Sequence, residues 1–179
     1  MTPYSVVVFL HVVSATGLVA ALALEGVTLA RLGTAPTVEV ARDRAGGFAA
    51  MPWVGIPSMV LILLTGGYLA TTWGWKPEWI RIAIPALLMF PLLGGTLTRK
   101  GITAIQQTLA APRESNAGPG KLGSLQLWLS WGIRVGTLVG VVFLMEVKPA
   151  LAVAVTAMAI AVAMGAALAF LPLPGKEAR

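Results

Sequence analysis

The sequence predicts an all-α protein, a polytopic membrane bundle of five transmembrane helices. Of its 179 residues, 57% are hydrophobic and only 11% are charged, whereas soluble domains carry roughly 25% charged residues. Five apolar segments are long enough to cross a bilayer, which takes about 20 residues. A water-soluble domain is therefore excluded, and we expect residues 1–179 to form a single transmembrane domain.

The apolar segments give the order of the elements. We expect the five helices at about residues 4–30, 52–71, 79–98, 125–145 and 149–171. The first segment contains Glu25, lacks a positive leading region and runs directly into a basic loop, so it should not be a cleaved signal peptide. Residues 36–44 can form a short amphipathic helix, and residues 99–124 are expected to be a loop that ends in a flexible linker at 112–124.

Lys and Arg residues are distributed unevenly over the connecting segments. Nine of the 13 lie in the segments 31–50, 99–124 and 172–179, three (Lys76, Arg81 and Lys148) lie on the other side, and Arg134 lies within the membrane. Because cytoplasmic loops carry the excess of Lys and Arg, the N-terminus is predicted outside and the C-terminus in the cytoplasm. The net charge of +6 thus reflects topology in a lipid bilayer and does not indicate nucleic acid. We expect a multi-pass protein of the bacterial inner (cytoplasmic) membrane.

One histidine and one carboxylate lie within the first apolar segment. His11 and Glu25 are 14 positions apart, nearly four turns at about 3.6 residues per turn, so they share one helix face. Ionisable groups in a bilayer are costly and usually pair or face the protein interior. This face should therefore point into the bundle.

Arg134 in the fourth segment lies at a depth compatible with Glu25. Pairing would satisfy two charges that are otherwise costly in lipid. Two interpretations stay open for this pair: a buried strut that fixes helix packing, or part of a substrate or proton path.

His11 is the single histidine, and the chain has no cysteine, so thiolate sites and multi-histidine metal sites within one chain are excluded. One interpretation is a neutral imidazole bonded across helices, to Ser14 or to a backbone carbonyl. The other is an axial ligand of a tetrapyrrole, haem b or chlorophyll. A second axial ligand would come from Met145, from the histidine of a second protomer, or from nothing at all.

Small residues form rows on the last two helices. Gly132, Gly136 and Gly140 have the four-residue spacing that lets another helix approach closely. A similar row on the fifth helix comprises Ala157, Ala161, Gly165 and Ala169. We expect one row to pack within the chain and the other to receive a partner or a second copy.

Several short motifs resemble those of small uncharacterised bacterial integral membrane proteins. They are FLHVV at 9–13, TGGY at 65–68, WGW at 73–75 and VFLMEVKP at 142–149. The resemblance covers most of the chain and implies a fold more than an activity. A more distant similarity runs to the copper-resistance D-type membrane proteins and the HemJ-type oxidases of the haem pathway, whose first helix also presents a histidine. Only His11 matches there, and the further histidines of those families are missing.

These patterns support three functional hypotheses. The first is a non-catalytic accessory or assembly subunit that docks on other membrane subunits or on itself through small-residue grooves. The second is a tetrapyrrole-binding protein that uses His11 as an axial ligand. The third is a small proton-coupled transporter that uses Glu25 and Arg134. The sequence contains no phosphate-binding loop and no Ser/His/Asp set, so it favours no soluble enzyme class.

Overall fold

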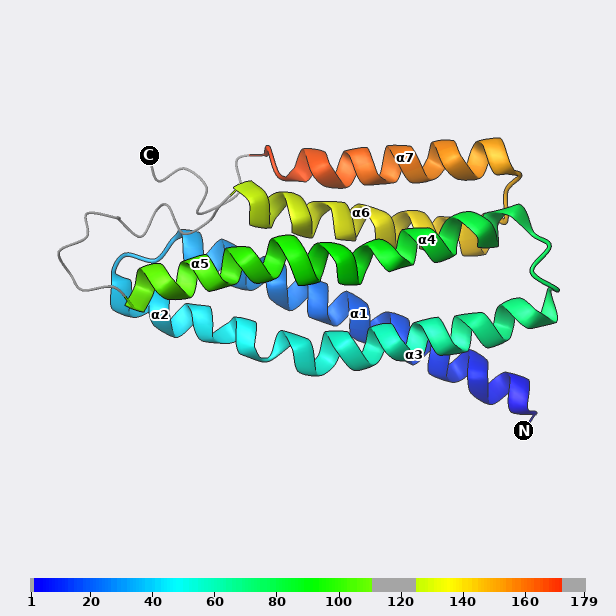
Figure 1. Ribbon diagram of the computed structural model, residues 1–179, viewed down its shortest axis with the longest axis horizontal. Coiled ribbons are helices and arrows are strands. Elements are labelled where there is room, and N and C mark those ends of the chain that lie inside the picture. Colours follow the sequence, from blue (N-terminus) through cyan, green and yellow to red (C-terminus); the bar gives the residue numbers. More distant parts are fainter. Residues whose placement is uncertain (1, 111–124, 172–179) are drawn as a thin grey trace.

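The computed structural model describes residues 2–110 and 125–171, which form a bundle of long helices (Figure 1). The helices are α1 (Pro3–Gly33), α2 (Val38–Ala45), α3 (Met51–Thr72), α4 (Glu78–Leu93), α5 (Arg99–Ala110), α6 (Leu125–Val147) and α7 (Leu151–Leu168). A 3-10 turn η1 (Gly46–Ala49) precedes α3, and a π-helical turn η2 (Gly94–Thr98) joins α4 to α5.

The predicted count of five spans is confirmed. Five helices are long and apolar enough to cross a membrane: Pro3–Gly33, Val38–Thr72, Glu78–Leu109, Leu125–Val147 and Leu151–Leu168. The short helix expected at 36–44 is also present, as α2. The described residues therefore form a multi-pass helical bundle, with the start of α1 at one end and the finish of α7 at the other (Figure 1). We call these the N-terminal end and the C-terminal end of the bundle.

Two helix pairs make up most of the bundle. α1 packs along α3, α6 packs along α7, and α4 lies against α6. The buried apolar side chains form two clusters. One cluster lies between α1, α3, α4, α6 and α7 and includes Leu22, Ile62, Leu87 and Leu144. The other lies nearer the C-terminal end, where Leu32, Phe48, Leu109 and Leu127 meet.

The third span is longer than the sequence predicts. Residues 99–110 were expected to begin a loop, but the chain stays helical through η2 into α5. The reason is an apolar stripe on α5: Ile105 and Leu109 are buried in the cluster at the C-terminal end. Arg42 of α2 donates a hydrogen bond to the carbonyl oxygen of Leu109 and ties the two short helices together. The expected flexible linker 112–124 lies outside the described residues.

The turns at the N-terminal end are linked by two contacts. Lys148 places its ammonium 4.8 Å from the centre of the Trp73 ring, which joins the α6–α7 turn to the α3–α4 turn. Glu78 accepts a hydrogen bond from the backbone N–H of Leu151 (2.7 Å) and so caps the start of α7. Lys148 has a φ of 50°, in the left-handed region that costs a non-glycine residue free energy.

Candidate functional site

His11 lies at the interface of α1 and α3, where Thr65 fixes its ring. The Nδ1 atom is 2.8 Å from the Thr65 hydroxyl oxygen, and that hydroxyl donates its one proton to the carbonyl oxygen of Leu61 (2.6 Å). Thr65 can therefore only accept from the ring, so Nδ1 carries the proton. The side chain found beside Nδ1 is Thr65 and not Ser14, one of the two partners expected, and the Ser14 hydroxyl donates to the carbonyl oxygen of Leu10 (2.6 Å).

The other ring nitrogen, Nε2, has an unshared electron pair. It is buried and has no hydrogen-bond partner among the described residues. Buried polar atoms are nearly always paired, so each exception needs an explanation. A histidine that ligates a metal donates its other N–H to a fixed acceptor, and the Nδ1–Thr65 bond provides this arrangement.

His11 packs against small residues of α3, Thr65 and Gly66. A Cβ atom on Gly66 would lie 3.2 Å from Cε1 of His11, so the glycine allows the ring to sit against the α3 backbone. Met145 is on α6, where it packs half-buried against the apolar cluster that contains Leu144. Met145 therefore has a place in this packing, and its role as a second axial ligand stays a prediction.

A second polar cluster surrounds Arg134. Its guanidinium forms a salt bridge with Glu25, and the two side chains are only 9% and 6% exposed. The same guanidinium donates to the hydroxyl of Thr98 (3.0 Å) and, through Nε, to the carbonyl oxygen of Ser130 (3.2 Å). The hydroxyls of Thr98 and Ser130 are 2.9 Å apart. Three helical segments, α1, η2 and α6, thus meet in one hydrogen-bonded network.

Sequence reasoning missed Thr65, Thr98 and Ser130. Ser130 could have been found, because it precedes Arg134 by one helical turn. Thr98 is presented by a π-helical turn, a local irregularity that often marks functional sites and that no residue pattern predicts. The contact of Thr65 with His11 depends on where α1 crosses α3, which the sequence does not specify.

The small-residue rows on α6 and α7 face each other. A Cβ on Gly132 would overlap the Gly165 carbonyl oxygen, and a Cβ on Gly136 would overlap that of Ala161. A Cβ on Gly140 would lie 2.8 Å from the sulfur of Met158. The expectation that one row receives a partner is therefore wrong, because close backbone packing within the chain uses both rows.

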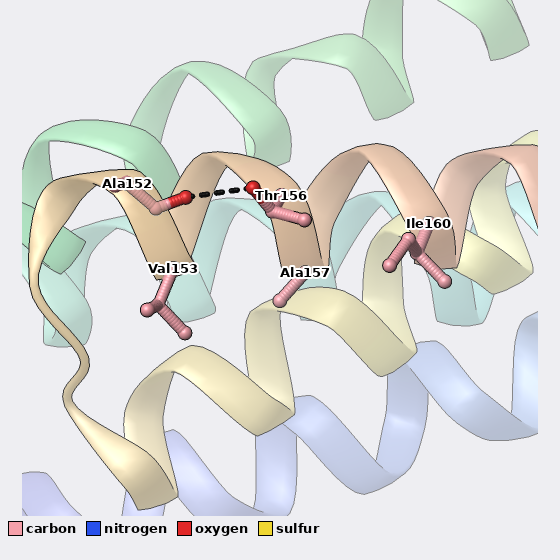
Figure 2. Close-up of a pocket in the computed structure, with 5 residues that line it drawn as sticks. All are labelled: Ala152, Val153, Thr156, Ala157 and Ile160. Atoms are coloured by element: carbon pink, nitrogen blue, oxygen red, sulfur yellow. Dashed lines mark hydrogen bonds between the residues drawn. The ribbon is translucent and has the colours of Figure 1, made fainter.

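A shallow hollow runs along α7 (Figure 2). It is lined by Ala152, Val153, Thr156, Ala157 and Ile160. The Thr156 hydroxyl donates to the carbonyl oxygen of Ala152 (2.9 Å), so the one polar side chain of the hollow is already satisfied. This apolar surface offers no group that would orient a polar ligand.

Within residues 2–110 and 125–171, no group of three or more His, Cys, Asp and Glu side chains is placed to hold a metal ion. No family model, no curated protein and no solved structure matches this chain. The function must therefore be argued from His11 and the Arg134 cluster.

Proposed function

We propose that this chain is a multi-pass protein of the bacterial cytoplasmic membrane that binds a tetrapyrrole, haem b in the first instance, through Nε2 of His11. The observation that carries the proposal is the buried Nε2 atom, which has no hydrogen-bond partner among the described residues. Neutral imidazole is a common axial ligand of haem iron. Thr65 contributes by holding the proton on Nδ1 and leaving Nε2 free to coordinate.

His11 can ligate the metal of a tetrapyrrole, but the macrocycle needs a movement of the helices around the ring. His11 supplies one nitrogen donor of the correct tautomer, and a bound haem would add one-electron redox chemistry. The ring is buried against α3, however, so a macrocycle reaches Nε2 only if α1 and α3 separate near Gly66. The proposal requires no ligand from Met145, which packs against the apolar cluster that contains Leu144.

The test is a hemin titration of the purified protein in detergent micelles, followed by visible absorption. We expect a saturable Soret band with a stoichiometry of one haem per chain. His11→Ala should abolish the band, Thr65→Val should weaken binding by freeing the imidazole tautomer, and Met145→Leu is the matched silent control. Wild-type binding no stronger than that of His11→Ala would contradict the proposal and leave His11 as a structural residue.

An accessory or assembly subunit is a second proposal. The salt bridge between Glu25 and Arg134 supports this proposal. If the pair only holds helices together, as a strut, the two charges serve no substrate or proton path. A partner would have to contact faces other than the small-residue rows, which are used internally. Purification in mild detergent should yield a larger complex or a homo-oligomer, whereas a monodisperse monomer would argue against this role.

The same pair underlies a third proposal, a small proton-coupled transporter. Two charged side chains are enclosed among three helical segments at one depth of the bundle. If a proton moves through this cluster, Glu25→Gln should abolish coupled uptake in vesicles while the protein still folds. Unchanged uptake in that variant would exclude the role.

A further inference from the structure

Among the residues that the structure describes, five basic ones gather at the C-terminal end of the bundle, and they divide into two groups. Arg42 donates to the carbonyl oxygen of Leu109, and Arg44 donates to the carbonyl oxygen of Arg31, so these two guanidinium groups satisfy helix ends. Arg31, Arg99 and Lys100 are exposed. The second group is therefore available to a partner outside the protein.

One close contact between α5 and α6 fixes the depth of Arg99 and Lys100. Gly101 lies directly against Leu127, since a Cβ on the glycine would be 2.7 Å from Cγ of that leucine. Leu127 is in the first turn of α6, a helix of 23 residues that spans about 35 Å at 1.5 Å per residue. The hydrocarbon core of a bilayer is about 30 Å thick. Arg99 and Lys100 thus lie where α6 leaves the hydrocarbon, at the level of the lipid phosphates.

The rest of α5 extends past this level. The continuous helix Glu78–Leu109 has 32 residues, about 48 Å by helical rise, which is longer than the hydrocarbon core. Figure 1 shows α5 reaching beyond the ends of α6 and α7 toward α2. The two cations are therefore not at a free helix end, where they could turn away into water. They sit on the side of a helix that passes through the headgroup layer.

The local charge balance favours an anion. The acidic residues described at this end, Glu39 and Asp43, are both on α2 beside Arg42 and Arg44, so α2 is close to neutral on its own. Within the described part of this end, the positive excess comes from Arg31, Arg99 and Lys100. Guanidinium groups bind phosphate oxygens in a bidentate manner, and ammonium groups add a strong point charge.

We propose that Arg99 and Lys100 bind the phosphodiester headgroup of an anionic phospholipid at the C-terminal end of the bundle. This inference is independent of any ligand at His11. Basic residues at the headgroup level attract anionic lipids by about 1 kcal/mol each, a factor of about five per residue. Loss of both should weaken the binding of the anionic lipid by about 30-fold.

The test uses nanodiscs of phosphatidylcholine with increasing phosphatidylglycerol, with thermal unfolding of the full chain as the readout. Phosphatidylglycerol should raise the unfolding temperature of the wild type. The variant Arg99→Gln/Lys100→Gln should lose this increase, while the charge-retaining variant Arg99→Lys/Lys100→Arg should keep most of it. In pure phosphatidylcholine all variants should unfold at similar temperatures, which checks folding separately from lipid binding.

The matched control removes two exposed cations from the opposite end. Lys76→Gln/Arg81→Gln takes away the same charge from the α3–α4 connection and the first turn of α4 and should keep the phosphatidylglycerol response. The proposal would be overturned if Arg99→Gln/Lys100→Gln and Lys76→Gln/Arg81→Gln lost the phosphatidylglycerol-induced rise in unfolding temperature equally, or if the wild type showed no such rise. Stabilisation by inorganic phosphate in phosphatidylcholine nanodiscs, to the extent seen with phosphatidylglycerol, would identify a free-anion site and overturn the lipid assignment.

Discussion

Removing one member of the Glu25–Arg134 pair should destabilise the bundle more than removing both. Arg134 makes three polar contacts, with Glu25, Thr98 and the Ser130 carbonyl. Both charged side chains are largely buried. Breaking a buried pair by deleting one partner typically costs about 3–5 kcal/mol, because the remaining charge is left without compensation.

The single variants Glu25→Met and Arg134→Met should each fall in that range. Arg134→Met should be the more costly of the two, because it also removes the donors to Thr98 and Ser130. The double variant should cost about 1–2 kcal/mol, since it leaves no buried charge and keeps the Thr98–Ser130 hydrogen bond. The three values therefore define a coupling energy of several kcal/mol.

The assay is reversible unfolding in bicelles by steric trapping, with all four proteins measured in the same lipid. An exposed cation provides the control: Arg81→Met should change the free energy of unfolding by less than about 0.5 kcal/mol. Additive effects, with the double variant equal to the sum of the singles, would refute the reasoning. In that case the two charges would be solvated separately rather than paired.

Other contacts give further expectations. Gly136→Leu should separate α6 from α7, because even a Cβ at this position overlaps the Ala161 carbonyl oxygen; its unfolding free energy should drop by several kcal/mol. The control is Gly67→Ala, because a Cβ at this position meets no heavy atom within 4 Å; it should be neutral or stabilising by up to about 1 kcal/mol. An equal loss of unfolding free energy in Gly136→Leu and Gly67→Ala would count against the packing argument. Lys148→Ala should lose about 0.5–1 kcal/mol with its contact to Trp73, whereas Lys148→Gly should be more stable than Lys148→Ala because glycine relieves the φ of 50°. The same unfolding assay decides both comparisons, and a glycine variant less stable than the alanine variant would exclude strain at this turn.

The number of membrane spans could be predicted from the sequence, because a helix that crosses the hydrocarbon core must be long and apolar. Both properties can be read from the length and composition of each segment. The buried face of α1 was also predictable: His11, Ser14, Leu18, Ala21 and Glu25 share a helical face, and all are buried. These predictions depend on periodicity within one helix.

Contacts between helices were less accessible to sequence reasoning. The partner of His11 depends on the point where α1 crosses α3, and the proximity of Thr98 to Arg134 depends on a π-helical turn. Both rows of small residues had the correct spacing, but spacing alone does not say which row faces which. The length of the third span was underestimated because α5 is amphipathic and its apolar stripe extends beyond the hydrophobic segment.

The most direct test of the account uses the fact that the chain has one histidine. Nitrogen NMR of the protein labelled with ¹⁵N-histidine then reports on a single imidazole. Our account predicts a protonated Nδ1 and a bare Nε2 in the ligand-free protein, and a shift of the Nε2 signal when diamagnetic zinc protoporphyrin is added. A proton on Nε2, or an Nε2 signal that does not respond to the porphyrin, would contradict it.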